Sequence, residues 1–461
     1  MTNPIINKMK KITLFLLVSI LTLSASSFDN KEGTRTLYAS QCGASLNSDV
    51  FAGGGTDDTQ ILQALLDSAP KMGRLHLIID GAALVSKTLV VHSNTTIECP
   101  DKSCGLFLAD SSNCRMIINA KRDRRVIYDR NISLIGGVYN QNAKGQRRGA
   151  GGNVINFEGI EYLNMRDLTV ANQRGWGMSI TNWRYVNMDN IHIDPRDRFV
   201  SSNQDGIHFH GPGRFLTMRN IYGSAGDDFI ALAPDEINAA EKSRGRRDKN
   251  DNDTTLTITD VLIDGVQVDN ADQVIRLLVC DAGYLDRIVI RNVTGTYNSY
   301  GFIINPWDWE TGRFGNMVFD MIDLRPLKNT YSYAYPFLFK LGGHIESLTV
   351  KNLYHHLPDF DHSLFIVGGH YTADRPAPEG KESVIDRLII DGMYIYEENI
   401  KSIPETYFRI KSKVGILSIK DVIHRRADGL PKTGSLILLD GGSIDELMLN
   451  NISAPALQTI R

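Results

Sequence analysis

The sequence predicts an all-β solenoid, a parallel β-helix in which each turn of the chain stacks on the turn before it. Two observations predict this fold: a short β-rich pattern recurs along most of the chain, and no long helical segments separate the copies. The pattern reads apolar, any, apolar, any, Asn or Asp, apolar. Eight copies begin at Leu163, Val186, Leu216, Leu256, Ile288, Leu348, Leu417 and Leu447.

The spacing of the copies supports a solenoid over other repeat folds. The Asn/Asp positions 167, 190, 220, 260 and 292 give steps of 23, 30, 40 and 32 residues. A step near 23 with a variable excess is typical of coils that carry loops. Propeller blades of about 40 to 45 residues would repeat more evenly, and a barrel of βα units would need helices between the strands. We expect the Asn/Asp residues to form a structural ladder at a coil corner, with no catalytic role.

Residues 53–69 predict a short helix that covers one end of the solenoid. No Pro-rich or Ser-rich linker interrupts residues 75–461, so we expect one β-helix domain over 40–461. The candidate N-cap residues are Asp57, Asp58 and Thr59. One apolar face of the helix follows and is formed by Ile61, Leu62, Leu65 and Leu66.

The N-terminus has the anatomy of a secretory signal. Lys8, Lys10 and Lys11 precede the apolar run 12–23, and small residues follow at 24–27. Twelve apolar residues fall short of the roughly 20 that a spanning helix needs, and no other stretch is long enough. We therefore expect a signal peptide over 1–27, a secreted or periplasmic protein, and no membrane span.

Composition and charge limit the kinds of molecule that we expect the protein to bind. A formal charge of −3 and a pI near 6.4 give no basic field, so we expect no nucleic-acid partner. The five cysteines have an irregular spacing that predicts no zinc site, and we assign no metal or cofactor. Cys99 and Cys104 flank a turn-like segment and are either a disulfide or buried free thiols.

Two acidic segments carry the chemistry. The segments 203–209 and 226–232 align at an offset of 23 residues, which places Ile207 beside Ile230 and Asp205 beside Asp228. Equivalent positions on successive coils lie about 5 Å apart. The two carboxylates should sit where the coil turns, just before each strand, because an unpaired charge is costly inside the core. Such a pair can hold a water molecule.

Asp227 completes a cluster of three carboxylates. Close like charges raise at least one pKa, so one group can stay protonated as an acid while others remain ionised as bases. Glycoside hydrolysis needs this combination of acid and base.

These residues resemble a known enzyme family. Asn203-Gln204-Asp205-Gly206 and Gly226-Asp227-Asp228-Phe229-Ile230-Ala231-Leu232 are similar to the Asp motifs of family 28 glycoside hydrolases, the polygalacturonase group, and residues 53–59 resemble the N-terminal cap of pectin-lyase-like β-helices. The resemblance implies a right-handed β-helix, a carbohydrate substrate and inversion at the anomeric carbon. It implies that Asp227 is the general acid, that Asp205 and Asp228 activate water, and that Asn203 binds substrate.

The residues that would contact the sugar differ from those of the family. The family's Arg-Ile-Lys corresponds best to Arg276-Leu277-Leu278, so Arg276 remains to meet a substrate carboxylate and the lysine is replaced by Leu278. A surface salt bridge is the alternative for Arg276. The family's Gly-His-Gly is absent, and the charged segment 241–253 occupies its place, either as a solvated loop or as a basic lid. These departures predict a sugar or linkage other than plain polygalacturonate.

Further polar and aromatic residues are candidates for substrate binding. His208 and His210 alternate with apolar neighbours, so we expect both to face outward, as substrate ligands or as ordinary surface residues. Trp307 lies in a loop after a strand, where its ring can stack on a sugar or pack against the coil. Three residues one coil before Asp205 could extend a cleft: Arg174, Trp176 and Trp183.

Two other functions remain open at this stage. A polysaccharide lyase or epimerase on the same scaffold would remove a proton beside a uronate carboxylate, with Arg276, Arg244 or Lys249 as the base. A carbohydrate-binding β-helix without catalysis is the other alternative, because a fold does not fix a function.

Overall fold

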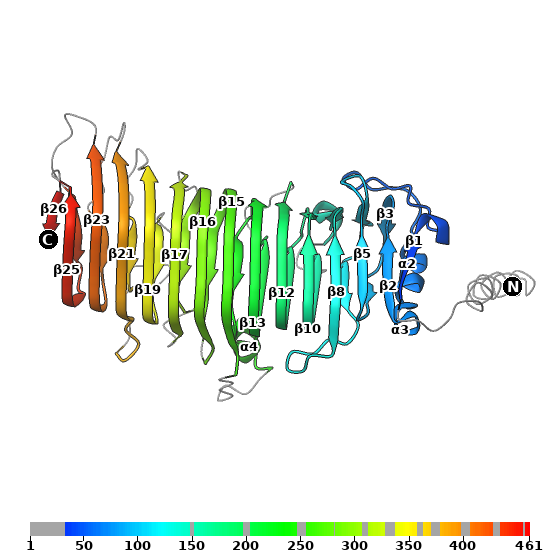
Figure 1. Cartoon of the computed structure of the whole chain (residues 1–461), viewed down its shortest axis with the longest axis horizontal. Coiled ribbons are helices and arrows are strands. Elements are labelled where there is room, and N and C mark those ends of the chain that lie inside the picture. Colours follow the sequence, from blue (N-terminus) through cyan, green and yellow to red (C-terminus); the bar gives the residue numbers. More distant parts are fainter. Residues whose placement is uncertain are drawn as a thin grey trace, which may run out of the picture.

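The computed structural model is a right-handed parallel β-helix, as the sequence predicts. Its strands form one long coiled sheet, and consecutive coils pair in parallel from the N-terminal to the C-terminal end (Figure 1). The structure describes residues 33–461 except 148–151, 197–202, 247–254, 281, 307–311, 328–336, 357–362, 370–378, 398–405, 427–433 and 455–456.

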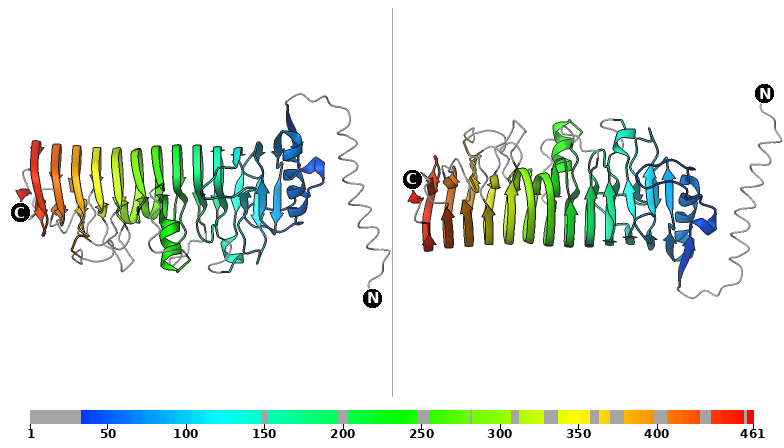
Figure 2. Two further views of the ribbon diagram at one scale, coloured as in Figure 1. Left: turned by 90° about the horizontal axis from the view of Figure 1, so that it is seen from below. Right: turned by 90° about the horizontal axis from the view of Figure 1, so that it is seen from above.

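A helical cap closes the N-terminal end. Helix α2 spans Thr59–Leu66 and α3 spans Ala69–Met72, and Figure 2 shows both against the first coils. Leu62 and Leu66 are fully buried, and the Asp57 carboxylate accepts the backbone N–H of Thr59 at 2.9 Å. The predicted capping helix is confirmed.

The first coils are built from short strands. They comprise β1 (Thr34–Tyr38), β2 (Arg74–Ile78), β3 (Ala82–Val85), β4 (Leu89–Val91), β5 (Thr95–Glu98), β6 (Gly105–Leu108), β7 (Ile117–Asn119), β8 (Asp129–Ile135) and β9 (Val138–Asn140), with 3-10 turns η1 (Ser40–Cys42) and η2 (Ala143–Gly145).

Many of the later strands are longer because they run through the coil corners without a break, and short strands alternate with them. The central ones are β10 (Ile155–Arg166), β11 (Thr169–Ala171), β12 (Met178–Asp194), β13 (Ile207–Gly223), β14 (Asp228–Leu232), β15 (Thr257–Leu277), β16 (Tyr284–Ile304) and β17 (Arg313–Pro326), with helix α4 (Glu236–Ser243) between β14 and β15. The C-terminal ones are β18 (Phe337–Leu341), β19 (His344–His356), β20 (Phe365–Val367), β21 (Val384–Glu397), β22 (Thr406–Ile410), β23 (Lys413–Arg426), β24 (Gly434–Leu439), β25 (Ser443–Ser453) and β26 (Leu457–Ile460).

The Asn/Asp positions form the predicted ladder at a coil corner. Asp167, Asn190 and Asn220 take left-handed backbone conformations, with φ of 60°, 54° and 53°. Asn and Asp tolerate this conformation better than other non-glycine residues. The Asn190 amide also donates to Asp167 Oδ1 on the preceding coil at 2.8 Å. The chain thus turns the same corner at each level.

One predicted copy of the repeat is out of register. Val261, and not Leu256, pairs with Leu216, so the corner residue of this coil is Gly265 and not Asp260. Gly265 has a φ of 81°, a conformation that glycine adopts without steric cost. A pattern restricted to Asn and Asp at the corner could not find this copy.

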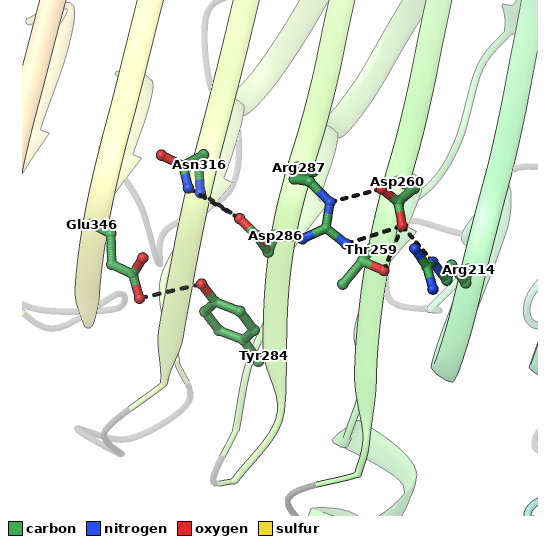
Figure 3. Close-up of polar contacts among 8 residues, drawn as sticks. All are labelled: Arg214, Thr259, Asp260, Tyr284, Asp286, Arg287, Asn316 and Glu346. Carbon is green, nitrogen blue, oxygen red and sulfur yellow. Dashed lines mark hydrogen bonds and ion pairs between the residues drawn. The ribbon is translucent and has the colours of Figure 1, made fainter.

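Asp260 instead belongs to a polar ladder on a side of the stack (Figure 3). Arg287 donates to both of its oxygens, from Nε at 2.7 Å and from Nη2 at 3.0 Å, and Arg214 Nε donates to Oδ2 at 2.7 Å. The Arg287 hydrogen bonds hold the pKa of Asp260 well below its usual range. The ladder joins the coils of β13, β15 and β16.

The interior is a continuous apolar column. Phe302, Phe339, Phe365 and Phe408 stack face to face on successive coils with ring centroids 4.7, 4.6 and 4.5 Å apart. Such aromatic pairs add about 0.5–1.5 kcal/mol each beyond their buried area. Identical inward positions therefore reinforce the register of the coils.

The structure decides between the two alternatives for Cys99 and Cys104. Cys99 and Cys104 are buried free thiols, so of the two alternatives the disulfide is wrong.

Among the residues that the structure describes, no helix has the length and apolarity to cross a bilayer.

Candidate active site

The paired aspartates lie at the edge of one face of the coiled sheet. This face, here called the site sheet, comprises residues 178–181, 207–210, 228–232 and 273–277. Ile207 pairs with Ile230, which confirms the predicted offset of 23 residues. Asp205 lies just before β13 and Asp228 is the first residue of β14. The coil turn thus keeps both carboxylates out of the apolar interior, on the outer face of the site sheet.

His208 joins the two carboxylates. Its Nε2 lies 2.6 Å from Asp205 Oδ2 and 3.6 Å from Asp228 Oδ2. Although burial lowers it, the charge of Asp205 raises the pKa of His208 well above its usual value. Burial raises the pKa of Asp205 to about 6, and the contact with His208 opposes this rise. His208 and Asp205 therefore form a close buried ion pair, although Nε2 and Oδ2 lack the alignment of a hydrogen bond.

The two aspartates keep free lone pairs. One donor atom from each of Asp205, His208 and Asp228 lies within 4.8 Å of the others. Asp205 Oδ1 and Asp228 Oδ1 are buried and have no hydrogen-bond partner among the described residues. A water molecule between these oxygens would satisfy both of them.

Asp227 faces different partners from its neighbour Asp228. Its Oδ2 accepts from Asn203 Nδ2 at 2.9 Å, and its Oδ1 accepts from Gln273 Nε2 at 3.3 Å. Burial, with the charges of Asp205 and Asp228, raises the pKa of Asp227 well above its usual range. Both effects favour the protonated form of Asp227 and suit this carboxyl group to the role of a general acid.

Trp176 and Trp183 have different roles, although both lie on the coil before Asp205. The Trp176 indole N–H donates to Asn203 Oδ1 at 3.0 Å, and its ring lies over His208 with centroids 4.1 Å apart. Trp183 is 2% exposed and packs edge to face on Phe209 inside the coil. The prediction that Trp183 extends a cleft is wrong, because its side chain points into the core.

Arg174 is half-buried on the same coil. Its backbone N–H donates to Gln141 Oε1 at 2.8 Å. This hydrogen bond fixes the turn that leads to Trp176.

Arg276 lies on the next coil of the site sheet, where it pairs with Ala231. It points away from the apolar interior, as the alternation predicts, yet it is only 5% exposed. Its guanidinium donates to the side-chain oxygen of Asn305. A surface salt bridge is therefore wrong for Arg276, which is a buried cation on a neutral partner.

The histidines are covered by an insertion that the sequence does not predict as a helix. His208 and His210 face away from the core but are 2% and 1% exposed, so the reading of an ordinary surface histidine is wrong. Helix α4 stands out from one side of the stack between β14 and β15 (Figure 2). It brings Glu236 Oε2 to 3.6 Å from His208 Nδ1 and 3.8 Å from His210 Nδ1.

Two anchors hold α4 in place. The Asp235 carboxylate accepts the backbone N–H groups of Cys280 and Gly283 on the next coil, at 2.8 and 3.1 Å. Near the other end, Glu241 pairs with Arg124 at 2.6 Å. The Asp235 contacts fix the end of the helix that carries Glu236 over the site sheet, whereas the partly exposed pair of Glu241 and Arg124 holds only the far end.

The sequence analysis missed Gln273, which holds Asp227, and it also missed Glu236. The only signal for Glu236 is the Pro234-Asp235-Glu236 segment directly after a strand, which is a common way to begin a helix. Residues 241–243 of the charged segment 241–253 belong to α4 and 244–246 form the turn after it, while 247–253, with Lys249, lie outside the described residues, as does Trp307.

Comparisons with known proteins show the fold alone. No protein-family model and no curated protein matches the sequence. Among solved structures, the endo-xylogalacturonan hydrolase of Aspergillus tubingensis matches 80% of this chain and 97% of its own, at 13% identity and a TM-score of 0.50.

Two further structures show a similar extent of match. The exopolygalacturonase of Thermotoga maritima matches 79% of this chain and 93% of its own (11% identity, TM-score 0.49). PfbA, a surface adhesin of Streptococcus pneumoniae, matches 82% and 92% (12% identity, TM-score 0.48). Both are β-helix neighbours at identities that carry no assignment of activity.

Proposed function

We propose that the protein is a glycoside hydrolase that cleaves a polysaccharide or oligosaccharide with inversion at the anomeric carbon. One observation carries the proposal: a half-buried aspartic acid with a raised pKa, Asp227, lies beside two carboxylates that keep free oxygens, Asp205 and Asp228. The β-helix fold, which this chain shares with the xylogalacturonan hydrolase, is compatible with this chemistry.

The proposed reaction is a single displacement. Asp227 donates its proton to the glycosidic oxygen as the bond to the anomeric carbon breaks. A water held by Asp205 and Asp228 attacks that carbon from the opposite face and gives its proton to one of the two carboxylates. Asn203 and Gln273 orient the acid through their hydrogen bonds to its two oxygens.

The substrate that we propose is uronate-containing, although not plain polygalacturonate. Arg276 is the cation of the site sheet nearest to the aspartates in register, and a guanidinium suits a carboxylate. Its neutral partner Asn305 leaves its charge uncompensated by that contact. Leu278 is buried in the position where the resemblance would expect a second cation.

A panel of pectic and other uronate-containing glycans tests the reaction class. Hydrolysis predicts new reducing ends without unsaturated sugars. Proton NMR of the first-formed product should show the anomer opposite to that of the cleaved bond. Unsaturated ends would favour the lyase, retained configuration would contradict the water pair, and binding without turnover would favour a non-catalytic role.

We also propose that residues 1–27 direct export and are removed. Expression of the whole chain in a secreting host should release a protein whose N-terminus, measured by mass spectrometry, lies near residue 27. A product that stays in the cytoplasm with residue 1 intact would contradict this proposal.

A further inference from the structure

Three donor groups beside the proposed acid and bases have no part in the hydrolytic reaction. They are His208, through its second ring nitrogen, His210 and Glu236. The two histidines lie two residues apart on β13, so both project from the same face of the site sheet. Glu236 reaches them from α4, and one donor atom from each of the three lies within 4.8 Å of the others.

The nitrogen and oxygen atoms of this cluster that could bind a ligand are buried and lack hydrogen bonds. His208 Nδ1, His210 Nε2 and Glu236 Oε2 have no hydrogen-bond partner among the described residues, and the two histidines are at least 98% buried. Buried polar atoms nearly always have a partner, so three orphaned atoms of ligand type at one place call for a bound group.

The second nitrogen of each imidazole faces an oxygen atom. His210 Nδ1 lies 3.2 Å from the Ala233 carbonyl oxygen, which can only accept, so Nδ1 carries the proton and Nε2 carries the lone pair. His208 Nε2 lies 2.6 Å from Asp205 Oδ2, although the two atoms lack the alignment of a hydrogen bond, and His208 Nδ1 is the ring nitrogen that faces Glu236. Histidines that bind metals usually give their second nitrogen to a carboxylate or a backbone carbonyl in this way.

We propose that His208, His210 and Glu236 bind a divalent transition-metal ion. Two imidazoles and one carboxylate suit Zn²⁺ and its neighbours in the first transition row, and they leave at least one coordination position open. The distance of 3.6 Å from Glu236 Oε2 to His208 Nδ1 is near the roughly 3.4 Å that separates donors around a tetrahedral ion, and one ligand atom from each of the three residues lies within 4.8 Å of the others. Binding would draw the three groups slightly together.

A metal between the aspartates is a weaker alternative. Asp205, His208 and Asp228 also offer three donors within 4.8 Å. However, Asp205 Oδ2 and His208 Nε2 are only 2.6 Å apart, which is too close for two ligands of one ion. The site therefore lies on the α4 side of His208.

The proposed ion would connect the insertion to the acid and base residues. It would fix α4 to β13 through Glu236 and would hold the His208 ring that contacts Asp205. His208 is thus a positioning residue whose two nitrogens face different partners. The proposal is independent of the hydrolase proposal, because metal binding can be measured without any glycan.

Titration with Co²⁺ tests the site directly. The whole protein, freed of metal with a chelator, should develop visible d–d absorption that saturates at one equivalent of Co²⁺, and Zn²⁺ should abolish the absorption. Glu236→Gln keeps the shape of the side chain and should weaken Co²⁺ binding at least about tenfold. Zn²⁺ should raise the melting temperature of the wild type and not that of Glu236→Gln.

The matched control is Glu241→Gln, which changes a carboxylate of the same helix that pairs with Arg124 and not with the histidines. It should bind Co²⁺ as the wild type does. Absence of stoichiometric Co²⁺ binding by the wild type, or unchanged binding by a folded Glu236→Gln, would overturn the proposal. Loss of metal binding in Glu241→Gln equal to that in Glu236→Gln would also overturn it.

Discussion

At the scale of single residues, the site depends on how differently two consecutive aspartates are placed. Asp228 faces His208 and the proposed water, whereas Asp227 is held by two amides, from Asn203 and Gln273. Amide donors stabilise the ionised form, but burial and the neighbouring carboxylates outweigh them and raise the pKa of Asp227. Adjacent positions in the sequence therefore acquire separate chemical roles.

The pH dependence of turnover should report this balance. Asp227 must be protonated to act as an acid, so activity should fall as the pH rises through its raised pKa. The Asn203 hydrogen bond lowers that pKa. Asn203→Ala should therefore move the alkaline limb of the kcat/KM profile to higher pH, and a shift to lower pH would contradict the assignment.

Trp176→Phe is the control for this shift. It removes the indole N–H that donates to Asn203 but leaves the hydrogen bond from Asn203 to Asp227 in place. Its alkaline limb should stay close to that of the wild type.

The two tryptophans of the preceding coil should differ in their effect on stability. Trp183 lies in the core against Phe209, so Trp183→Ala should lower the free energy of unfolding by about 3–5 kcal/mol. Trp176 is half-buried over the histidines, and Trp176→Ala should cost clearly less. Urea unfolding followed by circular dichroism measures both, and equal losses would contradict the different placements.

The alternation of side chains predicts direction but not exposure. It places His208, His210 and Arg276 on the outer face of the site sheet, and all three point there. Their burial could not be predicted, because it comes from Trp176, α4 and Asn305, which neighbour them only in the folded chain. For the same reason, the alternation gives no warning that Trp183 is a core residue.

At the scale of elements, the coil corners decide how the strands stack. A non-glycine residue in the left-handed region usually lowers the stability of the fold by about 1–2 kcal/mol, and the loss is smaller for Asn than for most residues. Asn190 combines this conformation with a hydrogen bond to Asp167 on the coil below. Gly265 meets the same backbone requirement with no side chain.

Substitution at Asn190 should separate conformation from hydrogen bonding. Asn190→Ala loses both the amide and the tolerance of positive φ, so it should destabilise the fold by about 1–2 kcal/mol. Asn190→Gly loses the amide only and should be the milder change. A chemical denaturation series compares the two, and an Ala variant as stable as the Gly variant would show that backbone conformation does not limit this corner.

Helix α4 is the element that the sequence could not predict. It lies in an insertion between β14 and β15, so it has no counterpart on neighbouring coils from which a position could be inferred. Glu236 is held over the site sheet because its neighbour Asp235 is hydrogen-bonded to the next coil. Repeats therefore predict the scaffold, while an insertion completes the candidate site.

At the scale of the whole molecule, the fold follows from a repeated coil and a closed end. The pairing of Ile207 with Ile230 could be predicted because the period of the pattern fixes the register of stacked coils. The N-terminal cap could be predicted because its apolar face follows a run of helix-capping residues. Both signals are local, and this is why they are visible in the sequence.

The cap should also protect the first sheet edges from association. Leu66 of α2 is fully buried against the first coils, so Leu66→Asp should loosen the helix and expose paired strands to other copies. We expect larger species in size-exclusion chromatography with light scattering. Gln60→Asp, on the exposed side of the same helix, should elute as the wild type does, and identical behaviour of both variants would contradict a protective cap.

The central claim is that Asp227 is the acid of a hydrolytic site, and turnover by Asp227→Asn tests it most directly. The isosteric amide cannot donate the required proton, so kcat on a glycan that the wild type cleaves should fall about 10²–10⁴-fold or more. The variant should keep the wild-type circular dichroism and melting temperature to within a few degrees. Turnover within a few-fold of the wild type in a folded Asp227→Asn protein would contradict the claim.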